Sequence, residues 1–293
     1  MPQLVGLALI ILLIFGGLMW SGGHGIMHAL PLELALIAGS GLGTLLLGNS
    51  LAVTKQALRG FSVAVRGAKW TSEDYTQLLV LLGGLMRRVK RGGFVAIEQD
   101  IEAPEEAASF QAAPAILKDE GARNLICDAF RLMALDLSDP QRARDRMAQS
   151  IQVHLDQRLK AVSALHTLAD ALPALGIVAA VLGIIRTMAV IDQSPAILGA
   201  MIATALLGTF LGVFLAYGIV GPVAARFGQV VEEEARMLDA AEAVLSAFGD
   251  GLQPGVALEM GRSSIPIEQQ PTSEAIDMAM SAARFAEAGK RVA

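Results

Sequence analysis

The chain has 293 residues, of which 54% are hydrophobic and 17% are charged, and its mean hydropathy is +0.53. This composition is too apolar for an ordinary soluble domain of that length, so it indicates a membrane protein. The net charge of -5 and the sequence pI of about 5.4 argue against a general nucleic-acid binder, and we expect no nucleic-acid partner.

Four apolar runs are long enough to cross the hydrocarbon core of a bilayer, which requires about 20 residues of helix. They cover residues 4–20, 34–53, 171–191 and 197–220. The sequence therefore predicts an all-α membrane protein whose four transmembrane helices form two hairpins, residues 1–54 and 171–222. A large helical cytoplasmic domain, residues 55–170, separates the hairpins, and a cytoplasmic helix and tail, residues 223–293, follow the second one.

The distribution of Lys and Arg predicts the orientation of these spans. Residues 55–170 carry 16 of the 23 basic residues, and six more follow Pro222. Because Lys and Arg are enriched in cytoplasmic loops near the membrane, we expect both segments and both termini in the cytoplasm. Short external loops then connect the spans at residues 21–33 and 192–196. The amino terminus lacks the basic segment of a signal peptide, so it is interpreted as the first span.

One motif in the second predicted span resembles a nucleotide-binding site. The stretch GTLLLGNS, Gly43 to Ser50, has the spacing of a phosphate-binding loop. Asn49 occupies the place of the lysine that would reach the phosphates, and the motif lies inside a membrane span, so an ATPase is excluded. No Ser-His-Asp or Cys-His arrangement stands out elsewhere. We therefore expect neither an enzyme nor a metal or other cofactor.

The predicted cytoplasmic domain contains a helix with a charged end. Residues 71–93 read TSEDYTQLLVLLGGLMRRVKRGG, in which Thr71 or Ser72 can cap the first free N–H groups and a glycine pair ends the helix. Its last turns gather four basic residues, Arg87, Arg88, Lys90 and Arg91. An acidic segment that contains Glu98 follows. On the charge pattern alone, a solvated surface is the simplest interpretation.

A further long helix is predicted to begin near Pro140. No strong helix breaker follows before Pro173, so this helix is expected to continue into the third span. The alternative is an ordinary helix that is broken near the membrane surface. After Pro222, an acidic, alanine-rich stretch is expected to continue the fourth span in the same way.

Small residues form stripes along the third and fourth predicted spans. They are Gly176, Ala179, Ala180 and Gly183 in the third span and Thr204, Gly208, Gly212 and Ala216 in the fourth. Such stripes let another helix backbone approach closely, either within the chain or on a partner. The only charges between residues 171 and 222 are Arg186 and Asp192, so neither span supplies a carboxylate. Arg186 either lies at the external rim or pairs with Asp192.

Several of these segments resemble the MotA family of flagellar motor stator proteins. They are LPALGIVAAVLG, LGAMIATALLGTFLGVFLAYGIVGPVA, PGVALEMGR, ELALIAGSGLGTLLLGN and MRRVKRGGFVAIEQDIEAP, and together they extend over nearly the whole chain. Related energisers of the ExbB and TolQ type resemble three-span proteins with an external amino terminus, so four spans favour the flagellar branch. The chain is thus expected to be a stator subunit that couples ion flow across the bacterial inner membrane to rotation.

The resemblance implies five copies of the chain, in membrane lipid, around two MotB-type subunits whose aspartate carries the ion. It places Pro173 and Pro222 at functional prolines, and Ala180 and Thr209 beside that aspartate. A partner helix is expected to pack against four glycines, Gly176, Gly183, Gly208 and Gly212. Sodium-driven relatives typically have threonine at the position of Ala180. Because a methyl group cannot supply the oxygen ligand that a hydroxyl can, the predicted ion is H+ rather than Na+.

The resemblance also implies a contact with the rotor protein FliG. The residues expected there are Arg87, Arg88, Lys90, Arg91 and Glu98. The basic position of the family falls on Lys90, and Arg91 follows directly, so which of the two engages the rotor stays open. Two other functions are kept as alternatives, an ExbB- or TolQ-type energiser of an outer-membrane process and a small-solute permease.

Overall fold

The computed structural model describes residues 2–20, 28–135 and 140–290. Within these ranges the regular structure is helical and no β-strand occurs, which confirms the predicted all-α class. The first part of the predicted external loop at residues 21–33, residues 21–27, lies outside the described residues.

The chain divides into two compact units. The first unit comprises Met1–Ala68 and Gln157–Val231, and the second comprises Lys69–Asp156 and Glu232–Ala293. Two long helices, α9 and α11, contribute residues to both units.

Helices make up the first unit, and most of them are apolar. They are α1 (Pro2–Trp20), α2 (Leu30–Gly48), α3 (Leu51–Arg66), the later part of α9 (Pro140–Met188), α10 (Pro195–Val213), a π-helical segment η3 (Phe214–Val220) and the start of α11 (Gly221–Gly249). Among the described residues, four helices are long and apolar enough to cross a membrane. Their outer surfaces expose many large apolar side chains, as expected of helices that face lipid. The chain is thus a membrane protein.

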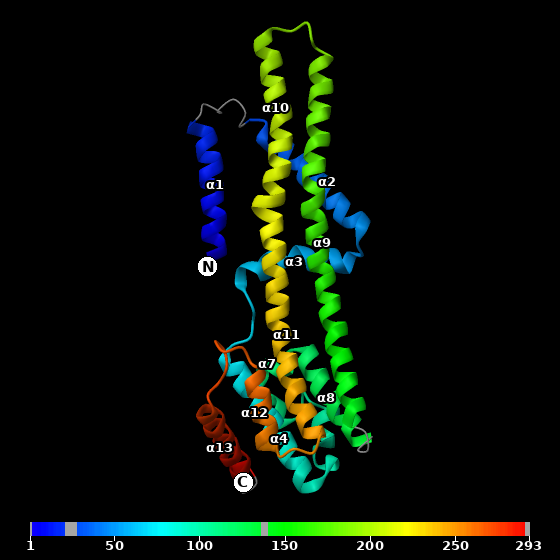
Figure 1. Ribbon diagram of the computed structural model, residues 1–293, viewed down its shortest axis with the longest axis vertical. Coiled ribbons are helices and arrows are strands. Elements are labelled where there is room, and N and C mark those ends of the chain that lie inside the picture. The colour runs from blue at the N-terminus through cyan, green and yellow to red at the C-terminus, as the bar shows by residue number, and fades with distance from the viewer. Residues whose placement is uncertain (1, 21–27, 136–139, 291–293) are drawn as a thin grey trace. The chain divides into compact units, whose positions relative to one another are not determined.

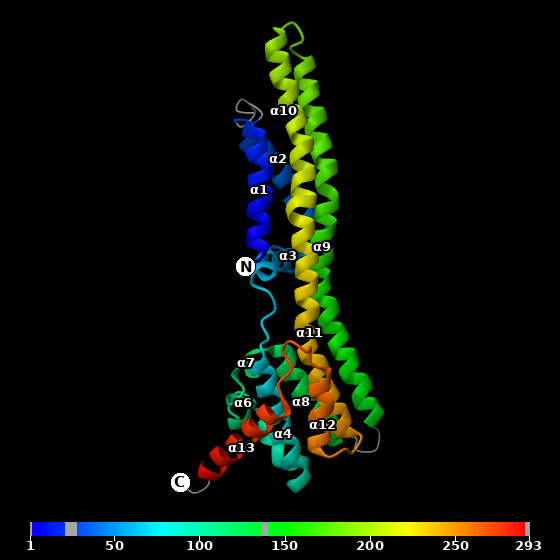
Figure 2. The same cartoon turned by 60° about the vertical axis from the view of Figure 1, so that its left-hand side comes forward.

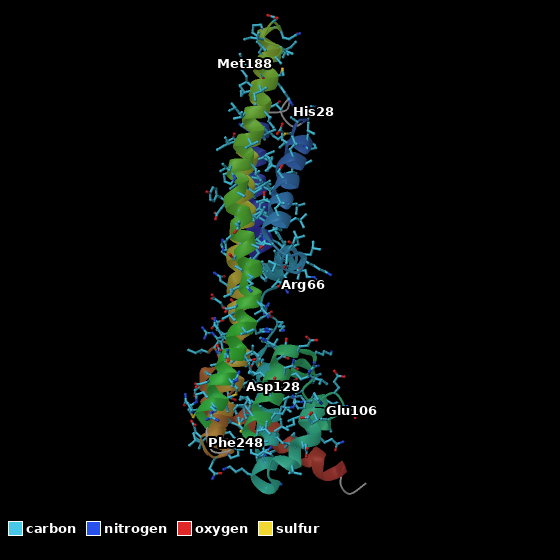
Figure 3. The ribbon with its side chains drawn as sticks, turned by 90° about the vertical axis from the view of Figure 1, so that its right-hand side faces the viewer. His28, Arg66, Glu106, Asp128, Met188 and Phe248 are labelled. Carbon is cyan, nitrogen blue, oxygen red and sulfur yellow. The ribbon has the colours of Figure 1, made fainter. Side chains whose placement is uncertain are left out.

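The helices of the first unit run in opposite directions. Figures 1 and 2 show α9 and α10 side by side, and α10 also contacts α2. In Figure 3, His28 and Met188 lie toward one end of this unit and Arg66 lies toward the other. The start of α2 and the end of α9 are therefore at the same end.

The second apolar run differs from the prediction at both ends. The helix begins at Leu30 rather than at residue 34, so it includes Glu33. It ends at Gly48 rather than at residue 53, because Asn49 is extended and the Ser50 side chain caps a new helix. The Ser50 hydroxyl accepts the N–H of Val53 at 3.4 Å. Local capping thus interrupts a stretch that remains apolar in sequence.

The long helices continue through both membrane-proximal prolines. α9 is unbroken across Pro173, as predicted from the absence of an earlier breaker. After the α9–α10 connection, the helical segments α10, η3 and α11 follow one another in the chain without a gap. A proline lacks the N–H that a helix needs and crowds the preceding turn. The wider π-helical turn of η3 ends at Val220, two residues before Pro222, and so lies in the turn that this proline would crowd.

The second unit is built around α4 (Ser72–Gly92). Its other helices are η2 (Phe94–Ile97), α5 (Glu98–Glu102), α6 (Ala108–Gln111), α7 (Pro114–Lys118), α8 (Glu120–Leu135), α12 (Pro254–Ser264), α13 (Ser273–Lys290) and parts of α9 and α11. Tyr75, Phe110 and Phe130 are fully buried in its core. Phe130 meets Phe248 edge to face, with ring centroids 6.4 Å apart. α4 contacts η2, α6, α7, α12 and α13, so it is the centre of this unit.

The predicted start and end of α4 are confirmed. The Thr71 hydroxyl accepts the N–H of Asp74, and the Asp74 carboxylate accepts the N–H of Thr71 at 2.8 Å, which forms a capping box. Gly93 follows the last residue of the helix with a φ of 71°. Glycine adopts this left-handed conformation readily, and the chain turns there into η2.

Candidate functional site

α9 and α10 approach each other at backbone distance in the first unit. A Cβ atom added to Gly176 of α9 would lie 2.8 Å from the carbonyl oxygen of Gly208 and 3.0 Å from the Cα of Gly212. A Cβ atom added to Gly212 would lie 2.7 Å from the carbonyl oxygen of Leu172. These distances leave no room for a side chain, so glycine is required for the two backbones to come this close.

The same contact includes the other two predicted glycines. A Cβ atom added to Gly183 would lie 2.6 Å from the Cβ of Ala205, and one added to Gly208 would lie 3.1 Å from the Cβ of Ala179. The four glycines therefore face each other's helices within one chain. This intrachain packing, one of the alternatives left open by the sequence, accounts for their small size. Packing of these glycines against a partner helix stays a prediction.

Ala180 and Thr209 lie beside this contact. The Cα of Thr209 is 3.3 Å from the Cβ position at Gly176, and the backbone nitrogen of Ala180 is 3.5 Å from the Cβ position at Gly208. Both residues are partly exposed. They therefore lie at the edge of the α9–α10 contact, where another chain can reach them.

A carboxylate outside the predicted set reaches the same contact. Glu33, in the first turn of α2, is 9% exposed, and its Oε2 atom lies 3.4 Å from the Cβ position at Gly208. No hydrogen bond or ion pair of this carboxylate is found among the described residues. An ionisable group between apolar membrane helices is costly and characteristic of an ion path. Glu33 is therefore a further candidate for the pathway.

The two predicted functional prolines lie in different surroundings. Pro173 is inside α9 and directly follows Leu172, whose carbonyl oxygen faces Gly212. Pro222 is exposed and lies beyond η3, in the first turn of α11. Pro173 is thus next to the glycine contact. Pro222 instead lies beyond the carboxyl end of α10, after η3.

Arg87 and Arg88, predicted for the rotor contact, are engaged within the second unit. Arg88 forms an ion pair with Asp100 of α5. Arg87 donates a hydrogen bond from Nη2 to the sulfur of Met280 in α13 at 3.5 Å. It also lines a cavity of 310 Å³ between α4, α12 and α13. The side chains of Arg87 and Arg88 therefore support the unit's own packing.

The remaining three predicted residues are exposed. The ammonium nitrogen of Lys90 lies 5.8 Å from the centroid of the Phe248 ring, within range of a cation–π interaction. For Arg91 and Glu98, no ion pair or hydrogen bond of the side chain is found in the described part of the chain. All three charges are therefore accessible to another protein, and Lys90 alone of them has a side-chain contact within the described part of the chain.

Comparison with known proteins identifies the family of the chain. Residues 4–93 match the family described as Motility protein A N-terminal, and residues 118–240 match the MotA/TolQ/ExbB proton channel family. Motility protein A of Salmonella typhimurium is 34% identical over 270 residues, which cover 92% of this chain and 91% of that protein. The chain belongs to the MotA family.

Other relatives of this MotA family chain include Motility protein A of Escherichia coli, with 34% identity over 92% of the chain and 91% of that protein. Chemotaxis protein LafT of Vibrio parahaemolyticus is 32% identical over 93% of the chain and 95% of that protein. The fold is similar to C. jejuni MotAB, with a TM-score of 0.72 and 16% identity over 93% of this chain and 98% of that one. The flagellar MotAB stator complex of Bacillus subtilis gives a TM-score of 0.65 and 18% identity over 87% and 92%.

Sequence reasoning did not single out Glu33 in this MotA family chain. Low hydropathy before residue 34 predicts an external loop over residues 21–33, yet α2 already begins at Leu30. The signal available in the sequence was the proline at position 31, which suits the first turn of a helix. A helix that starts there takes Glu33 into its first turn.

Proposed function

We propose that this chain is a flagellar motor stator subunit that couples proton flow across the bacterial inner membrane to torque on the rotor. Membership of the MotA family along 92% of the chain is the observation that carries this function. The close α9–α10 contact with a carboxylate beside it supports an ion path at that place. Residues 118–240 of the chain match a family that is described as a proton channel family, which also supports this function.

In the proposed topology, α1 with α2 and α9 with α10 form two transmembrane hairpins, and both termini are cytoplasmic. The excess of Lys and Arg in residues 55–170 supports this orientation. The opposite directions of α2 and α9 in the first unit are consistent with it. Residues 192–196 then form a short external connection. Arg186 and Asp192 near that connection are both exposed, and no ion pair between them is found among the described residues.

The proposed assembly is a homopentamer around two MotB-type subunits. Two of the similar solved structures are described as MotAB, which supports a partner of this kind. Each partner contributes the aspartate that carries the proton, because α9 and α10 have no carboxylate between Ala171 and Val213 other than Asp192 in their connection. Ala180 and Thr209, partly exposed at the edge of the α9–α10 contact, are the proposed neighbours of that aspartate.

Glu33 adds a proton-binding group from this chain to the proposed path. Its Oε2 atom and the backbone nitrogen of Ala180 both lie within 3.5 Å of the Cβ position at Gly208, the residue before Thr209. Glu33 and Thr209 are thus proposed to border the proton path at the same level of the first unit. Ala180, which offers no hydroxyl ligand, supports protons over sodium as the transported ion.

Torque follows from the charge state of the partner's aspartate. Each neutralisation relaxes its contact with one subunit and favours the next, so the pentamer rotates around the partner dimer. A membrane potential of 100 mV supplies about 2.3 kcal/mol for each charge that crosses. The exposed Arg91 and Glu98 transmit the motion to complementary charges on FliG. No covalent chemistry is involved.

Deletion of the gene tests this function against an ExbB- or TolQ-type energiser. A stator subunit predicts cells that assemble flagella but do not rotate them, and re-expression of the chain restores rotation. Normal swimming together with a defect in an outer-membrane process would support the energiser instead.

Reconstitution of the chain alone separates the stator from a small-solute permease. A stator subunit needs its MotB-type partner for the ion path, so vesicles that contain only this chain should show no rapid proton or solute flux. Flux without any partner would favour the permease.

A further inference from the structure

α3 follows α2 in the chain, and all of its charged residues are basic. Its sequence, LAVTKQALRGFSVAVR, contains three basic residues and no acidic one. Figures 1 and 2 show α3 at the end of the first unit where α1 begins and α2 ends, and Figure 1 shows it crosswise to α9 and α10. A helix with this direction at the end of two membrane spans lies along the membrane surface.

One face of α3 is fixed by packing within the first unit. Ala57 and Ala64 are buried, and a Cβ atom added to Gly60 would lie 2.7 Å from Cδ1 of the Phe227 ring in α11. Residues 57, 60 and 64 share one face of the helix because they are three or four positions apart. The rotation of α3 about its axis is therefore set by this contact.

An open groove of 610 Å³ extends along α3 from the edge of this packed face, where Thr54 is buried, over the exposed side of the helix. Its lining residues are Leu51, Thr54, Lys55, Leu58, Arg59 and Ser62. Leu51 is 78% exposed and Leu58 is 46% exposed, although both are large and apolar. No ion pair or hydrogen bond of the Lys55 or Arg59 side chain is found among the described residues. The groove thus combines apolar surface with two uncompensated positive charges.

Thr54 supplies an independent sign of a ligand. It is 5% exposed, and its hydroxyl has no hydrogen-bond partner among the described residues. The backbone of Thr54 is satisfied, since its N–H donates to the Ser50 carbonyl at 2.9 Å. An unpaired buried hydroxyl is unfavourable in a folded chain, and a polar atom that enters beside Thr54 would satisfy it.

We propose that the α3 groove binds one anionic phospholipid of the cytoplasmic leaflet. The phosphate is held by Lys55 and Arg59, the Thr54 hydroxyl donates to a headgroup oxygen, and the acyl chains lie along Leu51 and Leu58. Charge complementarity selects this occupant, because α3 has no acidic residue that would attract a basic partner. The apolar residues beside the charges favour a lipid over a free phosphate, which has nothing to place on Leu51 and Leu58.

The test is photo-cross-linking of the full chain, purified in neutral detergent with its MotB-type partner. Photoreactive phosphatidylglycerol should label residues 51–62, as mapped by mass spectrometry, and unlabelled phosphatidylglycerol should compete far better than phosphatidylcholine. The double variant Lys55→Gln, Arg59→Gln should weaken the competing affinity about 30-fold, which corresponds to about 1 kcal/mol for each of the two basic side chains.

A matched control and a smaller change keep the result interpretable. Lys118→Gln with Arg146→Gln removes the same charge from exposed positions of the second unit and should leave labelling unchanged. Thr54→Val keeps the shape of the side chain but removes the hydroxyl, and it should lower the affinity for phosphatidylglycerol while the complex still purifies intact. Equal competition by both lipids would overturn the proposal. Labelling that is unaffected by the α3 changes would also overturn it, as would a groove covered by a second copy of the chain and closed to both lipids.

Discussion

Glu33 places a carboxylate oxygen 3.4 Å from the Cβ position at Gly208, in a helix that has no other charged residue. Glu33 is buried, and Gly208 on α10, which has no side chain, leaves room for the carboxylate of Glu33. A side chain that binds and releases protons at this point would pass them toward the α9–α10 contact. This role depends on the acid and not on the volume of the side chain.

Replacing Glu33 with glutamine tests that role. Glu33→Gln keeps the size of the side chain but cannot bind or release a proton, so motor rotation should slow severalfold while the protein still assembles with its partner. Glu33→Asp should retain more rotation. The measurement is the speed of tethered cells, with co-purification of the MotB-type partner as a check on assembly.

The control for this change is Glu106→Gln, which neutralises an exposed acid of the second unit. It should rotate at the wild-type speed. Wild-type speed in Glu33→Gln as well would remove Glu33 from the proton path.

Lys90 and Arg91 differ in their surroundings, although both are exposed. Lys90 lies near the Phe248 ring, whereas no side-chain partner of Arg91 is found in the described ranges. Arg91→Glu should therefore reduce torque more than Lys90→Glu, and reversing an acid on FliG should partly restore it. Torque is measured from the rotation of beads attached to flagellar stubs. A larger effect of Lys90→Glu would assign the contact to that residue.

At the scale of elements, α9 and α10 depend on glycine at their contact. Gly212→Ala would bring a methyl group 2.7 Å from the Leu172 carbonyl oxygen, so the helices must separate or strain. Forcing extra volume into such a contact costs about 1–3 kcal/mol. The thermal unfolding midpoint of the purified complex should fall accordingly.

Gly199→Ala is the matched control on the same helix, because nothing lies within 4 Å of its Cβ position. It should leave the unfolding midpoint unchanged. If Gly212→Ala is as stable as Gly199→Ala, the two helices are not held at the distance described here.

Local signals in the sequence were sufficient to predict several elements. The capping box at Thr71 and the end of α4 before Gly93 follow from neighbouring residues, and both are confirmed. Hydropathy alone located the apolar helices but misplaced the ends of α2, because the extended Asn49 and the Ser50 cap interrupt a run that stays apolar through Val53. Hydropathy does not detect a helix boundary that a capping residue sets inside an apolar run.

The candidate site was less accessible to sequence reasoning, because it depends on which helices meet. A stripe of small residues predicts a close contact but does not identify the other side, and here α9 and α10 serve as each other's neighbour. The basic run of α4 likewise gave no way to distinguish Arg88, which pairs with Asp100, from Arg91. These assignments require the tertiary arrangement.

At the scale of the whole molecule, the family, the membrane helices and the carboxylate beside α10 point to one activity, the conversion of an ion gradient into rotation. Ala180 and Glu33 bear most directly on one part of this activity, the identity of the transported ion. A proton path needs a group that binds and releases H+, whereas a sodium path needs several oxygen ligands.

The most direct measurement is the rotation speed of tethered cells that carry this chain as their sole MotA family protein, with sodium replaced by potassium at a fixed proton-motive force. We expect the speed to be unchanged by the replacement and to fall to zero when a protonophore collapses the proton gradient. Rotation that stops without sodium, or that continues after the proton gradient has collapsed, would contradict a proton-driven stator.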